Sequence, residues 1–346
     1  MRRRRAAVAL AALGFAFAAA LCDAAEVKES HQILGSLVDV TVDGPDETFA
    51  QDRIRDAIAV ARLLEADFAA DRGNSDLARL NAASGLGPVK VSLDLYRILA
   101  LSQVMTRSTG DAFDVTVGPL LQRRQAGTGQ RRDVDEALDL VGADRILLQA
   151  PNRAELADSG MSIDLSAIEK GYLLERMAAS LRAAGVTRAL LGFGDSTVVA
   201  IGPPEPDSPF RIRVARGKSM AGSVALRDRA LSTARARRRG EESAQPPIVD
   251  PRSGRFVEND RQATVVARDA AIADAWSTAL VVDPDGTLGL LDEPRDVEAL
   301  VFDEHGEHRS PRFVAFSGWK AARTAPGATP DAADRDRDGG AAGRRH

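Results

Sequence analysis

The sequence predicts an α+β fold, in which mixed or antiparallel sheets carry packed helices. Apolar residues recur at helical spacing in several long segments, and in other segments they alternate with polar residues or form short apolar runs. A doubly wound parallel sheet would show these strand and helix patterns in regular alternation. The chain shows no such regular order, so the pattern favours an α+β architecture over a parallel sheet.

The first third of the chain predicts one strand and several helical segments. Residues 37–42 form an alternating strand pattern that ends at a turn signal, and residues 54–68 keep apolar side chains at helical spacing. Residues 74–81 begin with a helix-capping pattern, and residues 92–108 predict a second strong helix that begins at a serine and ends before a glycine. Residues 122–133 are polar and rich in Arg and Gly, which predicts a surface loop.

The rest of the chain predicts most of the sheet and two more helices. The expected helices cover residues 167–184, closed by Gly185, and residues 270–282. The expected strands are 162–165, a pair within 192–202, 210–214, 263–267 and short strands within 297–302.

The two ends of the chain are expected to lie outside the folded domain. Residues 1–25 combine a run of arginines, an apolar stretch and small residues, which is the pattern of a signal peptide cleaved after Ala24. Cys22 is the only cysteine, so a lipoprotein leader acylated there is an alternative, and an uncleaved membrane anchor is another. We therefore expect an exported, periplasmic protein, either released or anchored to the inner membrane through Cys22. Residues 26–320 would form one domain of two intimate lobes, and residues 321–346 a disordered tail.

Composition excludes several classes of function. The 346 residues are 44% hydrophobic and 28% charged, which is ordinary globular usage and excludes collagen-like, fully disordered and multi-span membrane proteins. The formal net charge is −4 and aromatic residues make up only 4%, so neither the charge nor the stacking surfaces of a nucleic-acid-binding protein are present. Small molecules or other proteins are the expected partners.

The helix expected at 270–282 carries the first candidate site. Asp274 and Thr278 are four residues apart, so they share one helical face, and Ser277 lies beside them. Hard cations such as Mg²⁺ take oxygen ligands and need only one or two protein carboxylates. The alternative is an exposed polar face, but the neighbouring residues are apolar, which favours a shielded carboxylate.

Two further segments combine charge with turn signals. In one of them Asp164 ends an expected strand and Lys170 lies in the first turn of the next helix, where free N–H groups favour anions. The alternative is an ordinary capped helix with Lys170 in water. The other segment places Asp114 beside Phe113 in a compact turn after a helix, which also fits a plain helix end. The four histidines are scattered, so the sequence gives little support for a zinc site or a Ser-His-Asp triad.

Taken together, these segments resemble the ApbE-type FAD:protein FMN transferases. The order of motifs is similar from about Ile33 to Phe302, and the joint run is more specific than any one motif. The segments that carry the resemblance are Ile33-Leu34-Gly35-Ser36, Asn74-Ser75-Asp76-Leu77-Ala78-Arg79-Leu80-Asn81, Gly110-Asp111-Ala112-Phe113-Asp114-Val115-Thr116-Val117-Gly118-Pro119-Leu120, residues 164–172, Ile248-Val249-Asp250-Pro251-Arg252-Ser253-Gly254 and Ala273-Asp274-Ala275-Trp276-Ser277-Thr278-Ala279.

The resemblance implies an ApbE-like flavin transferase fold and a Mg²⁺-dependent reaction. FMN would pass from FAD to a threonine hydroxyl of an exported or membrane flavoprotein that carries a Ser/Thr-Gly-Ala-Thr-like motif, and AMP would be released. By position, Asp274 would be the catalytic carboxylate. The metal would take oxygens from Asp274, Ser277, Thr278 and the backbone carbonyl of Ala167. Residues that would contact FAD are Leu34, Asp71, Ala112, Phe113, Asp114, Asp164, Lys170 and Ile248.

The chain departs from the family pattern at several positions. Pro247 stands where the family commonly has a histidine that is a candidate general base, and Asp71 stands where an aromatic residue often stacks on the flavin. The usual Met-Gly-Thr is Leu34-Gly35-Ser36. The usual Thr-Ser-Gly is Thr233-Ala234-Arg235, followed by an Arg-rich stretch. Two alternatives therefore stay open: a degenerate member that binds FAD or a protein partner without transfer, and a FAD pyrophosphatase.

Overall fold

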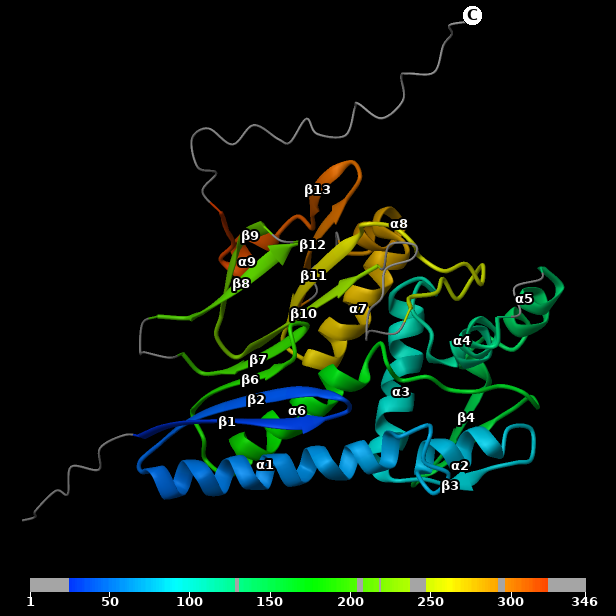
Figure 1. Cartoon of the computed structure of the whole chain (residues 1–346), viewed down its shortest axis with the longest axis horizontal. Helices are drawn as coiled ribbons and strands as arrows, with labels where there is room; N and C mark the ends of the chain where they lie inside the picture. The colour runs from blue at the N-terminus through cyan, green and yellow to red at the C-terminus, as the bar shows by residue number, and fades with distance from the viewer. Residues whose placement is uncertain are drawn as a thin grey trace, which may run out of the picture.

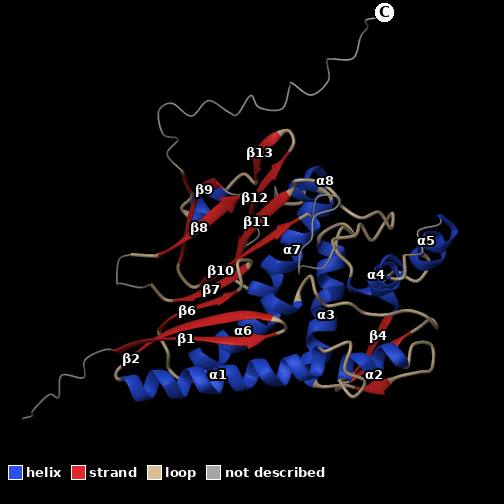
Figure 2. Ribbon diagram, viewed as in Figure 1, coloured by secondary structure: helices blue, strands red, loops and turns tan. Residues whose placement is uncertain are grey.

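The computed structural model describes residues 25–127, 131–203, 208–217, 219–236, 247–291 and 296–322. An eight-stranded antiparallel sheet runs through it, with the strand order β1-β2-β6-β7-β10-β11-β12-β13 (Figures 1 and 2). Its strands are β1 (Ala25–Ile33), β2 (Ser36–Gly44), β6 (Arg188–Phe193), β7 (Thr197–Ile201), β10 (Arg229–Arg235), β11 (Gln262–Ala267), β12 (Val297–Asp303) and β13 (Gly306–Arg309). The predicted α+β class with antiparallel sheets and packed helices is confirmed.

Two three-stranded sheets accompany the large one. One has the order β14-β9-β8 and the other the order β3-β5-β4. Their strands are β3 (Val89–Lys90), β4 (Ile146–Gln149), β5 (Arg153–Leu156), β8 (Phe210–Arg216), β9 (Ser219–Leu226) and β14 (Lys320–Ala321). Ala321, where the sequence predicts the start of a tail, pairs with Gly222 of β9, and residues 323–346 lie outside the described part of the chain. The predicted leader, apart from Ala25, also lies outside it.

Helices α1, α6 and α7 pack beside the large sheet. The helices are α1 (Glu47–Phe68), α2 (Asp76–Ala82), α3 (Leu93–Ser108), α4 (Gly118–Gln125), α5 (Arg131–Leu138), α6 (Glu169–Ala183), α7 (Ala270–Val282), α8 (Pro284–Gly289) and α9 (Phe313–Ser317), with short 3₁₀ turns at Val115–Val117 and Ala143–Arg145. Helix α7 has the predicted bounds, because Asp269 caps it by accepting from the N–H groups of Ala271 and Ile272. No helix within the described ranges is both long and apolar enough to cross a membrane.

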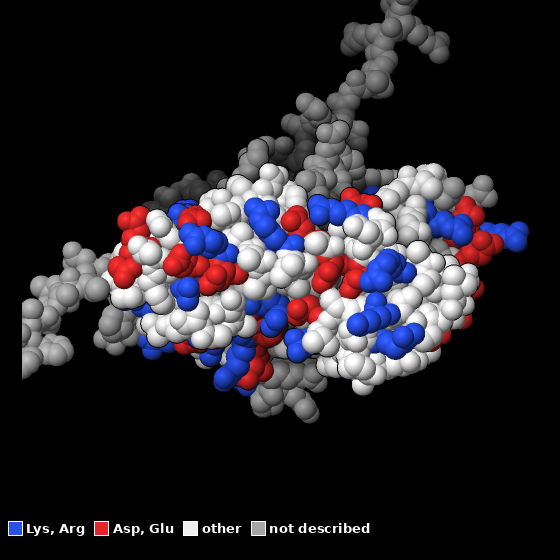
Figure 3. Space-filling view, turned by 90° about the horizontal axis from the view of Figure 1, so that it is seen from below, with Lys and Arg blue, Asp and Glu red and all other residues white. Residues whose placement is uncertain are grey.

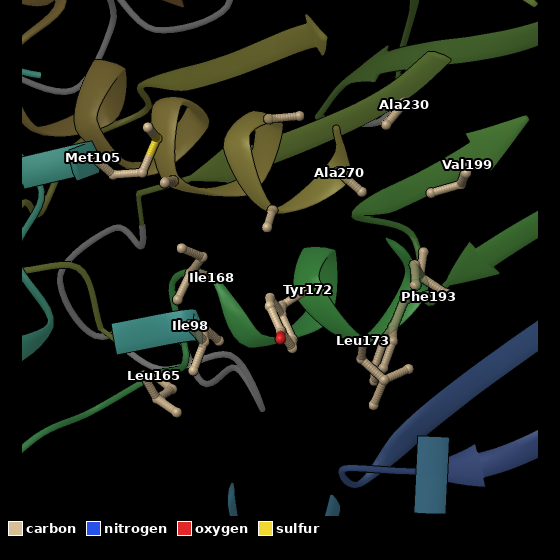
Figure 4. Packing of buried hydrophobic residues seen from close by; sticks show 14 of the residues in the cluster. Ile98, Met105, Leu165, Ile168, Tyr172, Leu173, Phe193, Val199, Ala230 and Ala270 are labelled. Atoms are coloured by element: carbon tan, nitrogen blue, oxygen red, sulfur yellow. The ribbon is translucent and has the colours of Figure 1, made fainter. Parts of the chain in front are cut away.

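The central strands are buried on both faces. Every residue of β11 and β12 is buried, and successive residues join different apolar clusters: Val265 packs with the main core and Val266 with the β8-β9 side. Figure 4 shows the main core, where residues of α3, α6 and α7 meet residues of the sheet. Since neighbouring residues of a strand point to opposite faces, Ser232 of β10 lies on the α7 side while Leu231 packs on the other side.

Two sequence predictions of local structure are wrong. Most of residues 122–133, predicted as a loop, lies in α4 and α5, because Leu121, Ala137 and Val249 form a small apolar cluster that holds these helices. Residues 162–165 form no strand. The side chain of Asn81 bonds both the N–H and the carbonyl of Ile163, and the N–H of Asp164 donates to Val115, so these backbone groups are satisfied without a strand partner.

Candidate functional site

Most of the predicted site residues line one cavity. It has a volume of about 780 Å³, counting the space open to solvent, and lies where the start of α6, one face of α7 and the end of β10 meet the segment 247–251. Its lining residues are Ala112, Phe113, Asp114, Val117, Leu121, Asp164, Ser166, Ala167, Lys170, Ser196, Thr233, Ala234, Arg235, Pro247, Ile248, Val249, Pro251, Asp274 and Thr278. Segments far apart in the sequence therefore converge here, as the resemblance implies.

Asp274 is the most constrained carboxylate of the cavity. Its Oδ2 accepts a hydrogen bond from the N–H of Gly171 at 3.0 Å, and its Oδ1 accepts one from the Ser232 hydroxyl at 2.8 Å. Burial raises the pKa of Asp274, while Lys170, the Gly171 N–H and the hydroxyls of Ser232 and Thr197 act to lower it. The carboxylate is thus buried, oriented from two sides and faced by a cation.

Asp274 also completes the start of another helix. Helix α6 has no side-chain cap, because its N-cap residue is Ile168, so its first N–H groups lack the usual acceptor. The bond from Gly171 to Asp274 satisfies one of these groups with a side chain of α7. The positive end of α6 therefore points at this carboxylate and favours negative charge in the cavity.

The first turn of α6 concentrates titratable groups. Asp164 accepts from both the N–H and the hydroxyl of Ser166 through its Oδ1, and no described residue donates to its Oδ2. Glu169 is half-buried. Its burial, and then the neighbouring charge of Asp164, raise its pKa to about 7, against a lowering effect of Lys170. Lys170 lines the cavity, and its contact with FAD stays a prediction.

The donor set suits a hard cation. Asp274 and Thr278 face the cavity from adjacent turns of α7, and Ala167 lines it from the loop that leads into α6. Within the described ranges no three His, Cys, Asp or Glu side chains gather into a metal cluster. A Mg²⁺ ion needs fewer protein ligands, since it keeps waters and takes substrate phosphate oxygens. The oxygen groups present therefore fit Mg²⁺ bound together with a phosphorylated ligand.

Asp114 lines the cavity but its carboxylate is occupied by the protein. It accepts from the N–H of Thr116 at 2.7 Å, from the Thr116 hydroxyl at 2.6 Å and from the N–H of Ala143 at 2.9 Å. Burial raises its pKa, and these hydrogen bonds act to lower it. Asp114 therefore fixes the turn that presents Ala112 and Phe113 to the cavity.

The segment 247–257 forms a further wall of the cavity, and charged hydrogen bonds of Arg252 hold it in place. Arg252 donates to Asp250 at 3.0 Å and to Asp283, the N-cap of α8, at 2.9 Å. These bonds raise the pKa of Arg252. They anchor the wall that places Pro247, Ile248 and Pro251 at the cavity, and no titratable group stands at position 247.

Three predicted site residues do not line the cavity. Leu34 has a positive φ of 49° in the β1-β2 turn, where its N–H donates to Glu65 at 2.7 Å. Asp71 is exposed in the turn between α1 and α2. The hydroxyl of Ser277 is fully buried and donates to the Asp274 carbonyl at 2.9 Å, so it faces its own helix. Their predicted contacts with FAD or metal stay predictions.

The cavity also holds polar residues that sequence reasoning did not assign. Ser196, Thr233 and Arg235 line it, and Ser232 bonds to Asp274 from behind. The departure of Arg235 from the family pattern was visible in the sequence. Ser232 gave no signal, because a serine in an apolar strand does not reveal which side chain it contacts.

Charge in the cavity is mixed. Its lining carries three carboxylates, Asp114, Asp164 and Asp274, and two cations, Lys170 and Arg235. On the surface, Figure 3 shows Lys and Arg side chains interspersed with Asp and Glu on the face that it presents. This face has no broad field of one sign, which agrees with the composition.

Comparison with known proteins identifies the family. A sequence model of the ApbE family matches residues 34–301, which is most of the chain. The protein belongs to the ApbE family. The match spans every cavity residue described above, so the cavity lies inside the domain that defines the family.

Curated relatives and solved structures agree with this membership. An FAD:protein FMN transferase of Klebsiella pneumoniae is 26% identical over 71% of this chain and 81% of its own length, and one of Treponema pallidum is 28% identical over 71% and 76%. A point mutant of the flavin transferase ApbE from Vibrio cholerae superposes with a TM-score of 0.74 at 20% identity, covering 84% of this chain and 99% of its own. The ApbE protein of Thermotoga maritima gives a TM-score of 0.72 at 25% identity, covering 85% and 99%. The predicted ApbE-like fold is confirmed.

Proposed function

We propose that this protein transfers FMN from FAD to a threonine hydroxyl of an acceptor protein and releases AMP, with Mg²⁺ as cofactor. This proposal rests on the convergence of Asp274, Thr278, Ala167 and Lys170 on one cavity, which is also lined by apolar residues that include Phe113 and Ile248. A flavin ring needs an apolar wall, and a diphosphate needs cations. The names of the relatives support the same substrate, because they are FAD:protein FMN transferases.

Charge supports the involvement of a divalent cation. The three carboxylates of the lining outnumber Lys170 and Arg235, so the protein alone does not neutralise a bound diphosphate. Asp274, Thr278 and the Ala167 carbonyl would hold Mg²⁺. When bound, the ion would stabilise negative charge on the diphosphate oxygens and on the departing AMP.

The reaction exchanges one phosphorus–oxygen bond for another. The threonine oxygen of the acceptor bonds to the phosphorus of the FMN half, the bond to the AMP phosphate breaks, and the threonine proton is taken up by a base. Asp274 is committed to Gly171, Ser232 and the cation, whereas Asp164 keeps its Oδ2 free of hydrogen bonds from described residues. We therefore assign the proton to Asp164, and Lys170 neutralises the diphosphate.

The family resemblance supports a proposal for the acceptor, and the leader supports one for the cellular address. We propose an exported or membrane flavoprotein with a Ser/Thr-Gly-Ala-Thr-like motif as acceptor, modified in the periplasm. The leader in residues 1–25 supports export, with release after Ala24 or anchoring through a lipid on Cys22 as the two routes.

The test measures AMP and the mass of the acceptor. The purified chain is mixed with FAD, Mg²⁺ and a domain that carries the acceptor motif. We expect AMP release together with a flavin-shifted acceptor, and loss of both in Asp274→Ala. Asp285→Ala is the matched control, because Asp285 is an exposed aspartate of α8, and it should retain both products.

Pro247 supports the two alternative functions. It lines the cavity at the position where the family commonly has a histidine, so a base is missing there. AMP release without a shifted acceptor would favour a FAD pyrophosphatase, with water as the nucleophile. No AMP above a chelated control, with several metals tried, would favour a protein that binds FAD or a partner without transfer.

A further inference from the structure

Three buried hydroxyls that are not part of the cavity lining gather around Asp274. They belong to Ser232 of β10, Thr197 of β7 and Ser277 of α7, and all three residues are fully buried. The Ser232 oxygen lies 2.8 Å from Asp274 Oδ1, 3.2 Å from the Thr197 oxygen and 3.5 Å from the Ser277 oxygen. A buried polar cluster of this kind must satisfy its own hydrogen bonds.

The hydrogen bonds of this cluster run toward the carboxylate. An ionised carboxylate only accepts, so Ser232 donates its proton to Asp274 Oδ1. The proton of Ser277 is used on the Asp274 backbone carbonyl at 2.9 Å. Thr197 is then the neighbour that can donate to the Ser232 oxygen. Ser232 is therefore the main support of Asp274 Oδ1, and Thr197 supports Ser232 while also acting on the carboxylate.

The other oxygen of the carboxylate is held from a different element. Gly171 of α6 donates to Oδ2, so β10 and α6 fix the two oxygens separately. Each oxygen has a further lone-pair direction left, and Asp274 itself lines the cavity. A hydrogen-bonded carboxylate presents a cation with a ligand that is already oriented.

We propose that Ser232, supported by Thr197, is a positioning residue that orients Asp274 and thereby sets the affinity of the site for its divalent cation. The inference rests on the proposed function, since it requires the cation. It assigns a role to two residues that line no part of the cavity. A purely structural role for the hydroxyls predicts a change in stability without a change in cation affinity.

The test is direct cation binding to the full chain. Mn²⁺ is titrated in the presence of FAD and without acceptor, and free Mn²⁺ is followed by electron paramagnetic resonance. We expect Ser232→Ala to weaken Mn²⁺ binding by about 10–100-fold, the usual effect of removing a hydrogen bond to a metal ligand. FAD binding in EDTA, followed by flavin fluorescence, should remain as in the unchanged protein.

The matched control removes an equally buried hydroxyl elsewhere. Ser102 of α3 is fully buried and donates to the Ile98 carbonyl of its own helix, so Ser102→Ala makes the same chemical change away from Asp274. It should leave Mn²⁺ binding unchanged. Equal Mn²⁺ binding by Ser232→Ala and the unchanged protein would overturn the inference. Equal weakening by Ser102→Ala would overturn it as well.

A second pair of variants covers the case in which Ser232→Ala does not fold. Thr197→Val keeps the shape of the side chain and removes the hydroxyl, and Thr197→Ser keeps the hydroxyl. We expect weaker Mn²⁺ binding in the valine variant and recovery in the serine variant, and equal binding by both would overturn the inference. If the unchanged protein itself binds no Mn²⁺ with FAD present, the proposed function fails along with the inference, which separates that result from a failure of Ser232 alone.

Discussion

The backbone N–H of Gly171 and the carboxylate of Asp274 join helices α6 and α7 through a 3.0 Å hydrogen bond at the wall of the cavity. A side chain at position 171 has no space, since a Cβ there would lie 2.2 Å from the carbonyl oxygen of Ala270. The close approach of the two helices and the orientation of the carboxylate therefore depend on the same glycine.

Gly171→Ala should destabilise the fold and weaken cation binding together. The new methyl group must push α6 from α7, which costs about 1–3 kcal/mol of unfolding free energy as in other overpacked cores. It also lengthens the bond to Asp274. Urea unfolding and Mn²⁺ titration measure the two effects. Gly289→Ala, at the end of α8 where a Cβ meets nothing, is the control, and a Gly171→Ala protein as stable as this control would contradict the prediction.

Glu169→Gln should stabilise the protein only above acidic pH. The pKa of Glu169 is about 7 in the folded protein against 4.5 for the free side chain, because of burial first and the Asp164 charge second. A raised pKa means that the folded state binds the proton more tightly. The unfolding free energy of the unchanged protein therefore falls as pH rises from about 4.5 to about 7. Glutamine carries no ionisable group, so the Glu169→Gln protein does not lose this unfolding free energy as the pH rises.

The comparison is made by thermal and urea unfolding in EDTA at pH 4.5 and pH 8. We expect the advantage of Glu169→Gln to grow by about 1–3 kcal/mol between these two conditions, since each pKa unit is worth about 1.4 kcal/mol. Glu26→Gln, an exposed change on β1, is the control and should show no such growth. An advantage for Glu169→Gln that is equal at both pH values would contradict the assignment.

Local signals predicted the parts of the site that lie on single elements. Helix α7 has the predicted bounds because Asp269 caps a segment that is apolar apart from Asp274, Ser277 and Thr278, and its i, i+4 spacing puts Asp274 and Thr278 on one helical face, which lines the cavity. The motif order placed Phe113, Asp164 and Ile248 at the same cavity. Here the sequence pattern and the tertiary structure carry the same information.

Contacts between distant segments were not predictable in this way. Ser232 lies 42 residues from Asp274 in sequence, and nothing in the pattern of its strand distinguishes it from a serine that faces elsewhere. Helix α5 was missed because its short apolar face packs on Leu121 and Val249, which are contacts that the local sequence does not show. The absence of a strand at 162–165 depends on the side chain of Asn81, which occupies the backbone groups of Ile163.

Arg235→Gln should weaken FAD binding. Arg235 ends β10 and is, with Lys170, one of the two cations in the described lining of the cavity, so its charge favours the diphosphate of FAD. We expect the dissociation constant of FAD to rise by about tenfold, with a weaker dependence on salt than in the unchanged protein. Flavin fluorescence titrations at low and high ionic strength measure both quantities.

Arg213→Gln is the control for this charge change. Arg213 is exposed on β8 and does not line the cavity. It should leave the affinity and its salt dependence unchanged. An Arg235→Gln protein that binds FAD as tightly as Arg213→Gln would show that the guanidinium does not contact the ligand.

Pro247→His should raise the rate of transfer to the acceptor. Pro247 lines the cavity but has no group that can accept a proton, and the wall that carries it is fixed by Arg252 through Asp250 and Asp283. A histidine placed there titrates near neutral pH, where general-base catalysis is most effective. We expect kcat to rise by at least about tenfold, which is less than the rate enhancement of about 10²–10⁴ that an evolved general base gives, and the affinity for FAD to stay unchanged.

Pro247→Ala is the control for this prediction, because it removes the proline ring without adding a base, and it should give no gain in kcat. If the two variants transfer FMN at the same rate, and the rate of the histidine variant shows no titration near pH ~6.5, the acceptor hydroxyl does not pass position 247 and its proton goes to Asp164 alone.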